Sequence, residues 1–351
     1  MNSHYVPQFI LKNFCNENNN LIYCDFERKT TSVRNTKSVF AEQDYYPEQL
    51  EKDLCHKAEY TFANLYHNKL ENAKNAIGLT ADELFIIKKY LVVSSIRFKY
   101  EFTNEGKSYY KTIPEEWQGL FGRDTAKILN GFLKLENSKD CFNYIDSFEK
   151  KLFEGNEPKE DSNMNASLWA ELREVLNNYL IFVRPKESEE FFIPDVGRGA
   201  YKGELAYQKL SATLMAFLDE ANDYPYNISR MLGPRDYMVY PISKKLAIIS
   251  MSVFYKMLSD SINMFGLVDL GEISSALGFS DNSVLRESVI KEKGIYHYKV
   301  KRINTHDVCH LNCISLAQSN RFVACSDLSK VQRSVHFAKD KADRDISFLE
   351  I

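Results

Sequence analysis

Five polar side chains are the strongest candidates for chemistry in this sequence of 351 residues: His4, Gln8, Glu59, Arg97 and Asp195. An imidazole titrates near neutral pH, so His4 can act as an acid, a base or a metal ligand. If His4 and Gln8 share one short helix, they lie on the same face, because they are four positions apart. Brought together by folding, the five side chains would form an acid–base and anion-binding cluster.

The charged members of this cluster need one another. Arg97 ends a helix that is predicted to be buried, and a buried charge without a partner is too costly. Glu59 or Asp195 would supply the partner. Such a pair is either purely structural or able to hold a phosphate or carboxylate ligand. His4 has the same two interpretations, because it either takes part in chemistry or holds the first segment against the core.

A second set of candidate ligands lies on a helix predicted at residues 305–319. The set consists of two histidines and two cysteines: His306, Cys309, His310 and Cys313. They form one stripe of residue types that zinc prefers, but one straight helix cannot place all four tetrahedrally around an ion. Further ligands would have to come from elsewhere, such as His336 or Cys325. The apolar neighbours favour an ordinary packed helix, so the sequence gives no strong metal motif and any cofactor stays unknown.

Asp195 also raises a nuclease hypothesis of its own. Nucleases of the restriction-enzyme kind place an aspartate at a strand end and an acidic-x-Lys sequence on the next strand, where they hold Mg²⁺ and orient water. Glu204 and Lys209 follow Asp195, but their spacing departs from that motif and their segment is predicted to be helical. The nearby glycines are not followed by the Gly-Lys-Ser/Thr sequence of a phosphate-binding loop.

The elements that must position these residues predict an α+β protein. We expect a helix-rich N-terminal half with a small β-hairpin at 21–40, and a C-terminal half with a small, mostly antiparallel sheet packed by helices. Thr80-Ala-Asp-Glu83 forms a capping box, which begins a buried helix to Tyr100. Further strands are expected at 179–183, 191–193, 236–243, 246–251, 295–303 and 321–325. Further helices are expected at 47–70, 166–177, 205–218, 252–265, 305–319 and 331–341.

The length suits one or two domains. The polar segment 154–165 is the candidate linker between a helical region with a hairpin, residues 1–153, and an α+β region, residues 166–351. One continuous domain is the alternative.

Composition narrows the class of protein. Hydrophobic residues make up 44% and charged residues 26%, which is typical of globular proteins. The sequence has no apolar run of membrane-spanning length and does not begin like a signal peptide, and its seven cysteines are mostly isolated. These features predict a cytoplasmic protein without a membrane partner. The net charge is −3, so charge does not favour duplex wrapping, and a protein or nucleic-acid partner remains open.

The start of the chain follows a recognisable pattern, namely His4-Tyr-Val-Pro-Gln-Phe9 with Leu11 and Phe14. This HYVPQF pattern resembles the N-terminal signature of the domain-of-unknown-function 4238 (DUF4238) family. That family continues with a hairpin, a helix with paired glutamates and a helix ending near an arginine, which match Glu51, Glu59 and Arg97. Its Ile-x-Ser-Asp-like turn matches residues 192–195. Here Pro194 replaces the usual small polar residue, and no proline follows Asp195.

Weaker matches lie at Tyr240–Ser243 and across residues 303–323, so the resemblance spans most of the chain. It implies no activity, because none is established for the family.

Two functions from different classes remain. The first is a hydrolase, nuclease-like or another toxic effector, that uses the five-residue cluster. A role in a bacterial defence system is suggested by the genomic context of uncharacterised bacterial families and not by these residues. The second is a non-enzymatic sensor or protein-binding module in which the same cluster is structural. An open cleft that joins His4, Arg97 and Asp195 would favour the first, because a general base must reach a substrate atom.

Overall fold

The structure is a computed structural model that describes residues 2–43, 48–97, 178–186, 188–201, 237–251, 278–281, 284, 289–319 and 321–338. The strands are β1 (Asn2–His4), β2 (Leu21–Asp25), β3 (Thr30–Arg34), β4 (Ala41–Gln43), β5 (Ala76–Leu79), β6 (Tyr179–Pro185), β7 (Ile193–Pro194), β8 (Gly199–Tyr201), β9 (Tyr237–Ser243), β10 (Leu246–Met251), β11 (Val289–Glu292), β12 (Ile295–Ile303) and β13 (Phe322–Cys325). The α-helices are α1 (Gln8–Lys12), α2 (Glu48–Leu54), α3 (Tyr60–Leu65), α4 (Ala81–Arg97), α12 (Thr305–Gln318) and α13 (Leu328–Ala338). A 3-10 turn, η1 (Thr36–Ser38), and two π turns, η2 (Cys55–Glu59) and η3 (Tyr66–Leu70), complete the set.

The strands form a seven-stranded sheet, a four-stranded sheet and a two-stranded ribbon. The large sheet has the order β11-β12-β6-β10-β9-β8, with β5 paired to β12, and its strands are antiparallel except for β12 and β6. Every residue of β6, β9 and β10 is buried, as expected of strands with both faces covered. The α+β class is therefore confirmed, but the sheet is larger than the small one that the sequence predicts.

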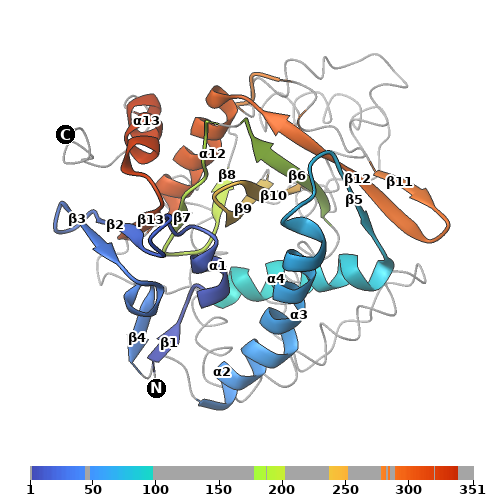
Figure 1. Ribbon diagram of the computed structural model, residues 1–351, viewed down its shortest axis with the longest axis horizontal. Coiled ribbons are helices and arrows are strands. Elements are labelled where there is room, and N and C mark those ends of the chain that lie inside the picture. The colour runs from blue at the N-terminus through green and yellow to red at the C-terminus, as the bar shows by residue number, and fades with distance from the viewer. Residues whose placement is uncertain are drawn as a thin grey trace, which may run out of the picture.

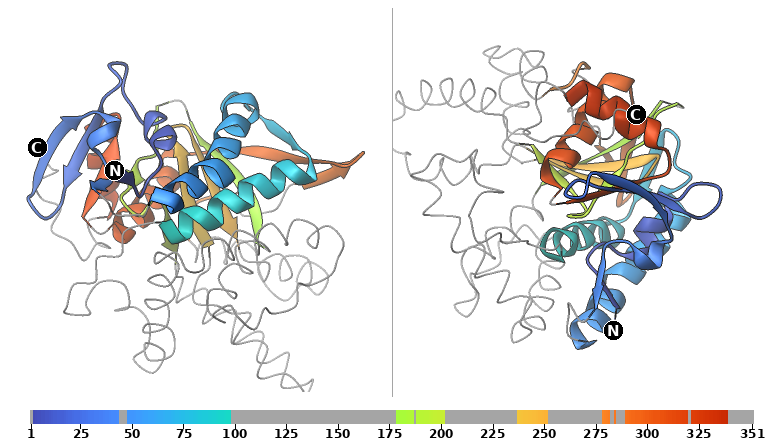
Figure 2. Two further views of the ribbon diagram at one scale, coloured as in Figure 1. Left: turned by 90° about the horizontal axis from the view of Figure 1, so that it is seen from below. Right: turned by 90° about the vertical axis from the view of Figure 1, so that its left-hand side faces the viewer.

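Helices lie on both sides of the strands. The right-hand view of Figure 2 shows α12 and α13 on one side of the large sheet and α4 on the other. Figure 1 shows the β2–β3 hairpin at one end of the molecule and the β11–β12 hairpin at the opposite end. No helix in the described part of the chain has both the length and the apolar character that a membrane span requires.

Segments from the two ends of the sequence share sheets. The four-stranded sheet has the order β3-β2-β13-β7, so the hairpin predicted at 21–40 is not isolated but pairs with β13. Likewise, β5 pairs with β12. The predicted linker, residues 154–165, and the helices predicted at 166–177, 205–218 and 252–265 lie outside the described residues. The division into residues 1–153 and 166–351 therefore stays a prediction.

The first segment differs from the single helix considered above. His4 ends β1 and pairs with Ala41 of β4, whereas Gln8 begins α1 after Pro7. Proline fits this position because the first N–H groups of a helix have no carbonyl partner within the helix, so the N–H that proline lacks costs no hydrogen bond. The chain therefore turns between His4 and Gln8 rather than carrying both on one helix.

The capping box at the start of α4 is confirmed. The Glu83 N–H donates to Thr80 Oγ1 over 3.2 Å, and the Thr80 N–H donates to Glu83 Oε2 over 2.9 Å. Lys69 Nζ adds an ion pair to the same carboxylate oxygen at 2.7 Å. These bonds satisfy two backbone donors that no helical carbonyl could reach.

We expect Thr80→Ala to lower the free energy of unfolding by about 1 kcal/mol, because the Glu83 N–H then loses its acceptor. Urea unfolding measures the change. Thr80→Ser is the matched control and should stay close to the wild type, since it keeps the hydroxyl. Equal stability of Thr80→Ala and Thr80→Ser would show that the cap is dispensable.

Candidate functional site

Three segments far apart in the sequence meet where Gly197 follows β7. A Cβ atom on Gly197 would lie 3.5 Å from Ser94 Oγ of α4 and 3.8 Å from Val6 Cγ2, and its φ of +68° suits glycine. We call this meeting of Val6, Ser94 and Gly197 the junction. His4 lies two residues before Val6, and Asp195 lies two residues before Gly197. Three of the five predicted residues, counting Arg97 at the end of α4, thus belong to segments that converge here.

His4 contacts Gln8, as the predicted cluster requires. Its side chain is buried, and Nε2 lies 3.2 Å from Gln8 Nε2. Which of the two groups donates the hydrogen depends on the tautomer of the imidazole. The turn after β1 thus brings together two side chains that neither a strand nor a helix alone would place in contact.

Asp195 is held by the backbone of β13. Its Oδ2 accepts the N–H groups of Arg321 over 2.8 Å and of Phe322 over 3.0 Å. Its own N–H donates to the Phe322 carbonyl over 2.9 Å. Asp195 is 4% exposed, so these charge-assisted bonds fix the end of β7 against β13. The same bonds fix the segment that leads into Gly197.

Glu59 lies near the aromatic side chains through which α1, α3 and α4 contact one another. It is partly buried at the end of η2 and lies one turn before Phe62. The Phe62 ring stacks on Tyr90 of α4, with centroids 4.0 Å apart, and Phe9 of α1 contacts both rings edge-on. The side chain of Arg97 lies outside the described residues, so its pairing with Glu59 or Asp195 stays a prediction. Glu204 and Lys209 also lie outside them.

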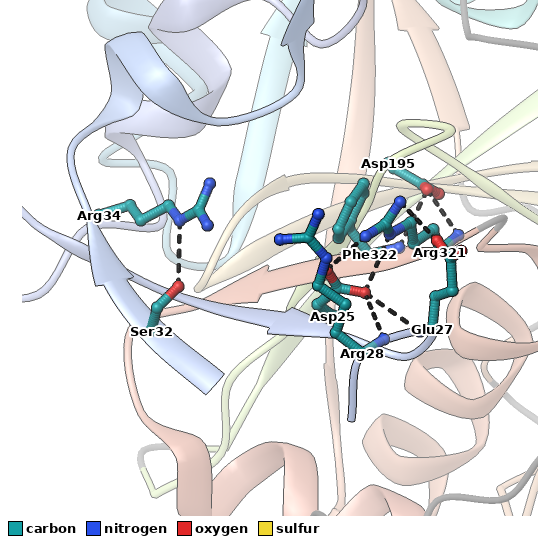
Figure 3. A network of polar contacts seen from close by, with 8 residues as sticks. All are labelled: Asp25, Glu27, Arg28, Ser32, Arg34, Asp195, Arg321 and Phe322. Atoms are coloured by element: carbon teal, nitrogen blue, oxygen red, sulfur yellow. Dashed lines mark hydrogen bonds and ion pairs between the residues drawn. The ribbon is translucent and has the colours of Figure 1, made fainter. Parts of the chain in front are cut away.

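A charged network beside Asp195 was not predicted from the sequence (Figure 3). Arg321 Nε and Nη2 donate to Asp25 Oδ1 and Oδ2 over 2.9 and 2.8 Å, and Arg321 Nη1 pairs with Glu27 at 2.5 Å. Burial would raise the pKa of Asp25. The hydrogen bonds from Arg321 and from the Arg28 N–H outweigh this effect, so the pKa lies below its usual value. No local pattern could reveal this pair, because 296 residues separate its members.

The same network contains a stack of two cations and two rings, which we call the cation–aromatic ladder. Arg34 lies over the Tyr23 ring at 4.6 Å, Tyr23 stacks on Phe322 at 4.6 Å, and Arg321 lies over Phe322 at 4.6 Å. The four side chains cross β3, β2 and the start of β13. Burial is the main cause that raises the pKa of Tyr23, so the phenol is neutral at physiological pH.

The His–Cys stripe of α12 faces several different partners. His310 Nε2 lies 2.8 Å from the Tyr237 hydroxyl, His306 Nδ1 lies 3.1 Å from Asp307 Oδ1, and Cys313 Sγ donates to the Ser334 carbonyl over 3.1 Å. Burial raises the pKa of the Cys309 thiol, which disfavours the thiolate that a metal needs. Within the described ranges, no group of three or more histidine, cysteine, aspartate or glutamate residues could hold a metal ion.

Comparison with known proteins gives one match. A family described as a protein of unknown function (DUF4238) matches residues 2–329. Searches of curated proteins and of solved structures found no match. The matched range contains the junction, the charged network and all five residues of the predicted cluster.

Proposed function

The chain belongs to the DUF4238 family, and from this premise we propose that the junction is a hydrolytic, nuclease-like site in which His4 moves the proton and Arg97 binds an anionic substrate. The observation that carries the proposal is the approach of Gly197 to Val6 and Ser94. This approach supports the convergence of the His4, Arg97 and Asp195 segments. An imidazole beside a guanidinium is a combination that phosphodiester hydrolysis uses, since one moves protons and the other neutralises phosphate charge.

The roles follow from the chemistry of each side chain. His4 accepts a proton from water as the water oxygen forms a bond to phosphorus, and the proton goes to the leaving oxygen as the phosphorus–oxygen bond breaks. Gln8 orients the imidazole through its contact with Nε2. Glu59 holds the guanidinium of Arg97, and Asp195 is a positioning residue because it fixes the segment before Gly197. A toxic effector of a bacterial defence system is the biological setting we propose for this activity.

The test is hydrolysis of a panel of nucleic acids and nucleotides by the purified protein, combined with metal analysis. We expect His4→Ala to lower the rate by a factor of about 10² to 10⁴, with an unchanged melting temperature. His56→Ala is the matched control, because His56 is an exposed histidine of η2. The wild-type rate should also rise with pH through the imidazole range. Full activity of His4→Ala, or a rate without that pH dependence, would contradict the proposal.

A second function is favoured by the burial of the same groups. His4 and Asp195 are 6% and 4% exposed, and both make hydrogen bonds within the fold. These are the properties of a structural lock in a non-enzymatic sensor or protein-binding module. On this proposal no substrate of the panel is cleaved, and His4→Ala lowers the melting temperature. Loss of activity without loss of stability would exclude this second function.

A further inference from the structure

The segment that runs from the turn of the β2–β3 hairpin through β3 to η1 carries a concentration of positive charge. Residues 28–41 contain four cations and no carboxylate, although the whole chain has a net charge of −3; the cations are Arg28, Lys29, Arg34 and Lys37. All four side chains are exposed. Among the described strands, β3 pairs only with β2, so it forms an edge of the four-stranded sheet. Arg34 therefore lies on an edge strand, and the other three cations flank that strand in the sequence.

One of these cations is held in a fixed orientation. Arg34 Nε donates to Ser32 Oγ over 3.0 Å (Figure 3). The guanidinium also lies over the Tyr23 ring. An exposed arginine without such contacts samples many rotamers, and ordering it on binding costs free energy. Arg34 has its plane set in advance, at the outer end of the cation–aromatic ladder. A planar group placed on that guanidinium would extend the ladder by one layer.

Ring contacts connect this edge to the junction. Tyr23 lies 5.7 Å from Phe40, and Phe40 lies 6.0 Å from Tyr5, measured between ring centroids. The Tyr5 N–H also donates to the Phe40 carbonyl over 3.0 Å. Tyr5 directly follows His4. Three successive contacts, Arg34 on Tyr23, Tyr23 on Phe40 and Phe40 on Tyr5, therefore connect a partner bound at Arg34 to the segment that carries the proposed acid–base group.

We propose that the β3 edge binds a single strand of nucleic acid, with phosphates on the four cations and one base stacked on Arg34. Charge complementarity supports a polyanion, and the oriented guanidinium plane supports a partner with exposed flat rings. A duplex hides its base faces, whereas a single strand presents them. The cations recognise phosphate and the plane recognises a base, so DNA and RNA are bound by the same chemistry. This inference rests on the proposed function where it names the substrate class of the junction.

Fluorescence anisotropy of the full chain with a labelled single-stranded DNA oligonucleotide tests the binding. We expect Arg34→Glu to raise the Kd at least tenfold. Arg34→Lys should raise it at least fivefold although it keeps the charge, because it loses the stacking plane. Lys293→Glu is the matched control: it reverses an exposed charge in the turn of the opposite β11–β12 hairpin and should bind like the wild type. Because each lost phosphate contact removes about 0.7 from the slope of log Kd against log salt, Arg34→Glu should give a shallower dependence.

Binding and cleavage are separated by the His4→Ala variant. Its Kd for the oligonucleotide should equal that of the wild type even where cleavage is lost. The proposed binding surface is therefore tested independently of the proposed hydrolase. An unchanged Kd in Arg34→Glu would overturn the inference. Displacement of the DNA by polyglutamate at equal charge concentration would also overturn it, because the edge would then recognise negative charge alone and not a base. Equal binding of Arg34→Lys and the wild type would overturn the stacked base.

Discussion

Replacing Arg321 with methionine is expected to lower the free energy of unfolding by about 3 kcal/mol or more. The change removes both guanidinium bonds to Asp25, whose side chain is only 9% exposed. A buried carboxylate without its partner loses far more than the net value of the pair, because the cost of desolvation remains. Urea unfolding followed by circular dichroism measures the change. A loss below about 1 kcal/mol would contradict a tightly coupled pair.

Two further variants isolate the cause. Arg321→Lys keeps the charge but cannot form two parallel bonds, so it should lie between the wild type and Arg321→Met. The double variant Asp25→Leu, Arg321→Met should recover part of the loss, since an apolar pair leaves no buried charge. If the double variant is as unstable as the sum of the single variants, the two residues do not act as a pair.

The pH dependence of stability gives an independent check on Asp25. Its pKa lies below the usual value, so the stability that it contributes is fully present above the unfolded pKa of about 3.9. That contribution is lost as the pH falls through the lower folded pKa. The difference in stability between the wild type and Asp25→Leu, Arg321→Met should therefore change between neutral pH and pH 2, in the direction that weakens the wild type.

Gly278→Ala is expected to destabilise the protein by about 3 kcal/mol. Gly278 has a φ of +88°, and a Cβ there would lie 2.2 Å from His310 Cε1. The left-handed backbone costs about 1 to 2 kcal/mol for alanine, and overpacking adds about 1 to 3 kcal/mol. The His310 ring cannot swing away cheaply, because it is buried and its Nε2 is bound to the Tyr237 hydroxyl. Thermal unfolding measures the loss.

Gly294→Ala separates the two contributions. Gly294 has a similar φ of +79°, but a Cβ there would meet nothing within 4 Å. We expect this variant to lose only the backbone contribution of about 1 to 2 kcal/mol. The difference between the two variants then gives the cost of the contact with His310. Equal losses at both positions would show that His310 moves aside freely.

Local signals in the sequence predicted local structure well. The capping box located α4, because its two hydrogen bonds join residues three positions apart. Alternating polar and apolar residues and short apolar runs located β6, β9, β10 and β12, because these signals also lie within one short segment. The way in which those strands join could not be predicted, since pairing of β2 with β13 depends on contacts between opposite ends of the sequence.

The candidate site divides in the same way. His4 and Gln8 could be selected by residue type and spacing, although their contact arises from a turn rather than from a shared helix. The carboxylate of Asp195 accepts hydrogen bonds from backbone N–H groups. Residue types could not predict these contacts, because the partners are not side chains. Likewise, the scattered arginines of the sequence did not indicate a fixed cation. Arg34 becomes one through the ring of Tyr23 beneath it and the hydroxyl of Ser32 beside it.

The four-stranded sheet also constrains the order of events during protein synthesis. β2 and β3 leave the ribosome well before β13, the strand that pairs with β2 and begins at Phe322. Until then the hairpin is a two-stranded ribbon, which is marginal on its own in water. Completion of the sheet must therefore follow translation of residues 35–321, which separate β3 from β13, and closure of such distant contacts is slow. During that interval the nascent hairpin has an unpaired β2 edge, which is exposed to pairing with other chains.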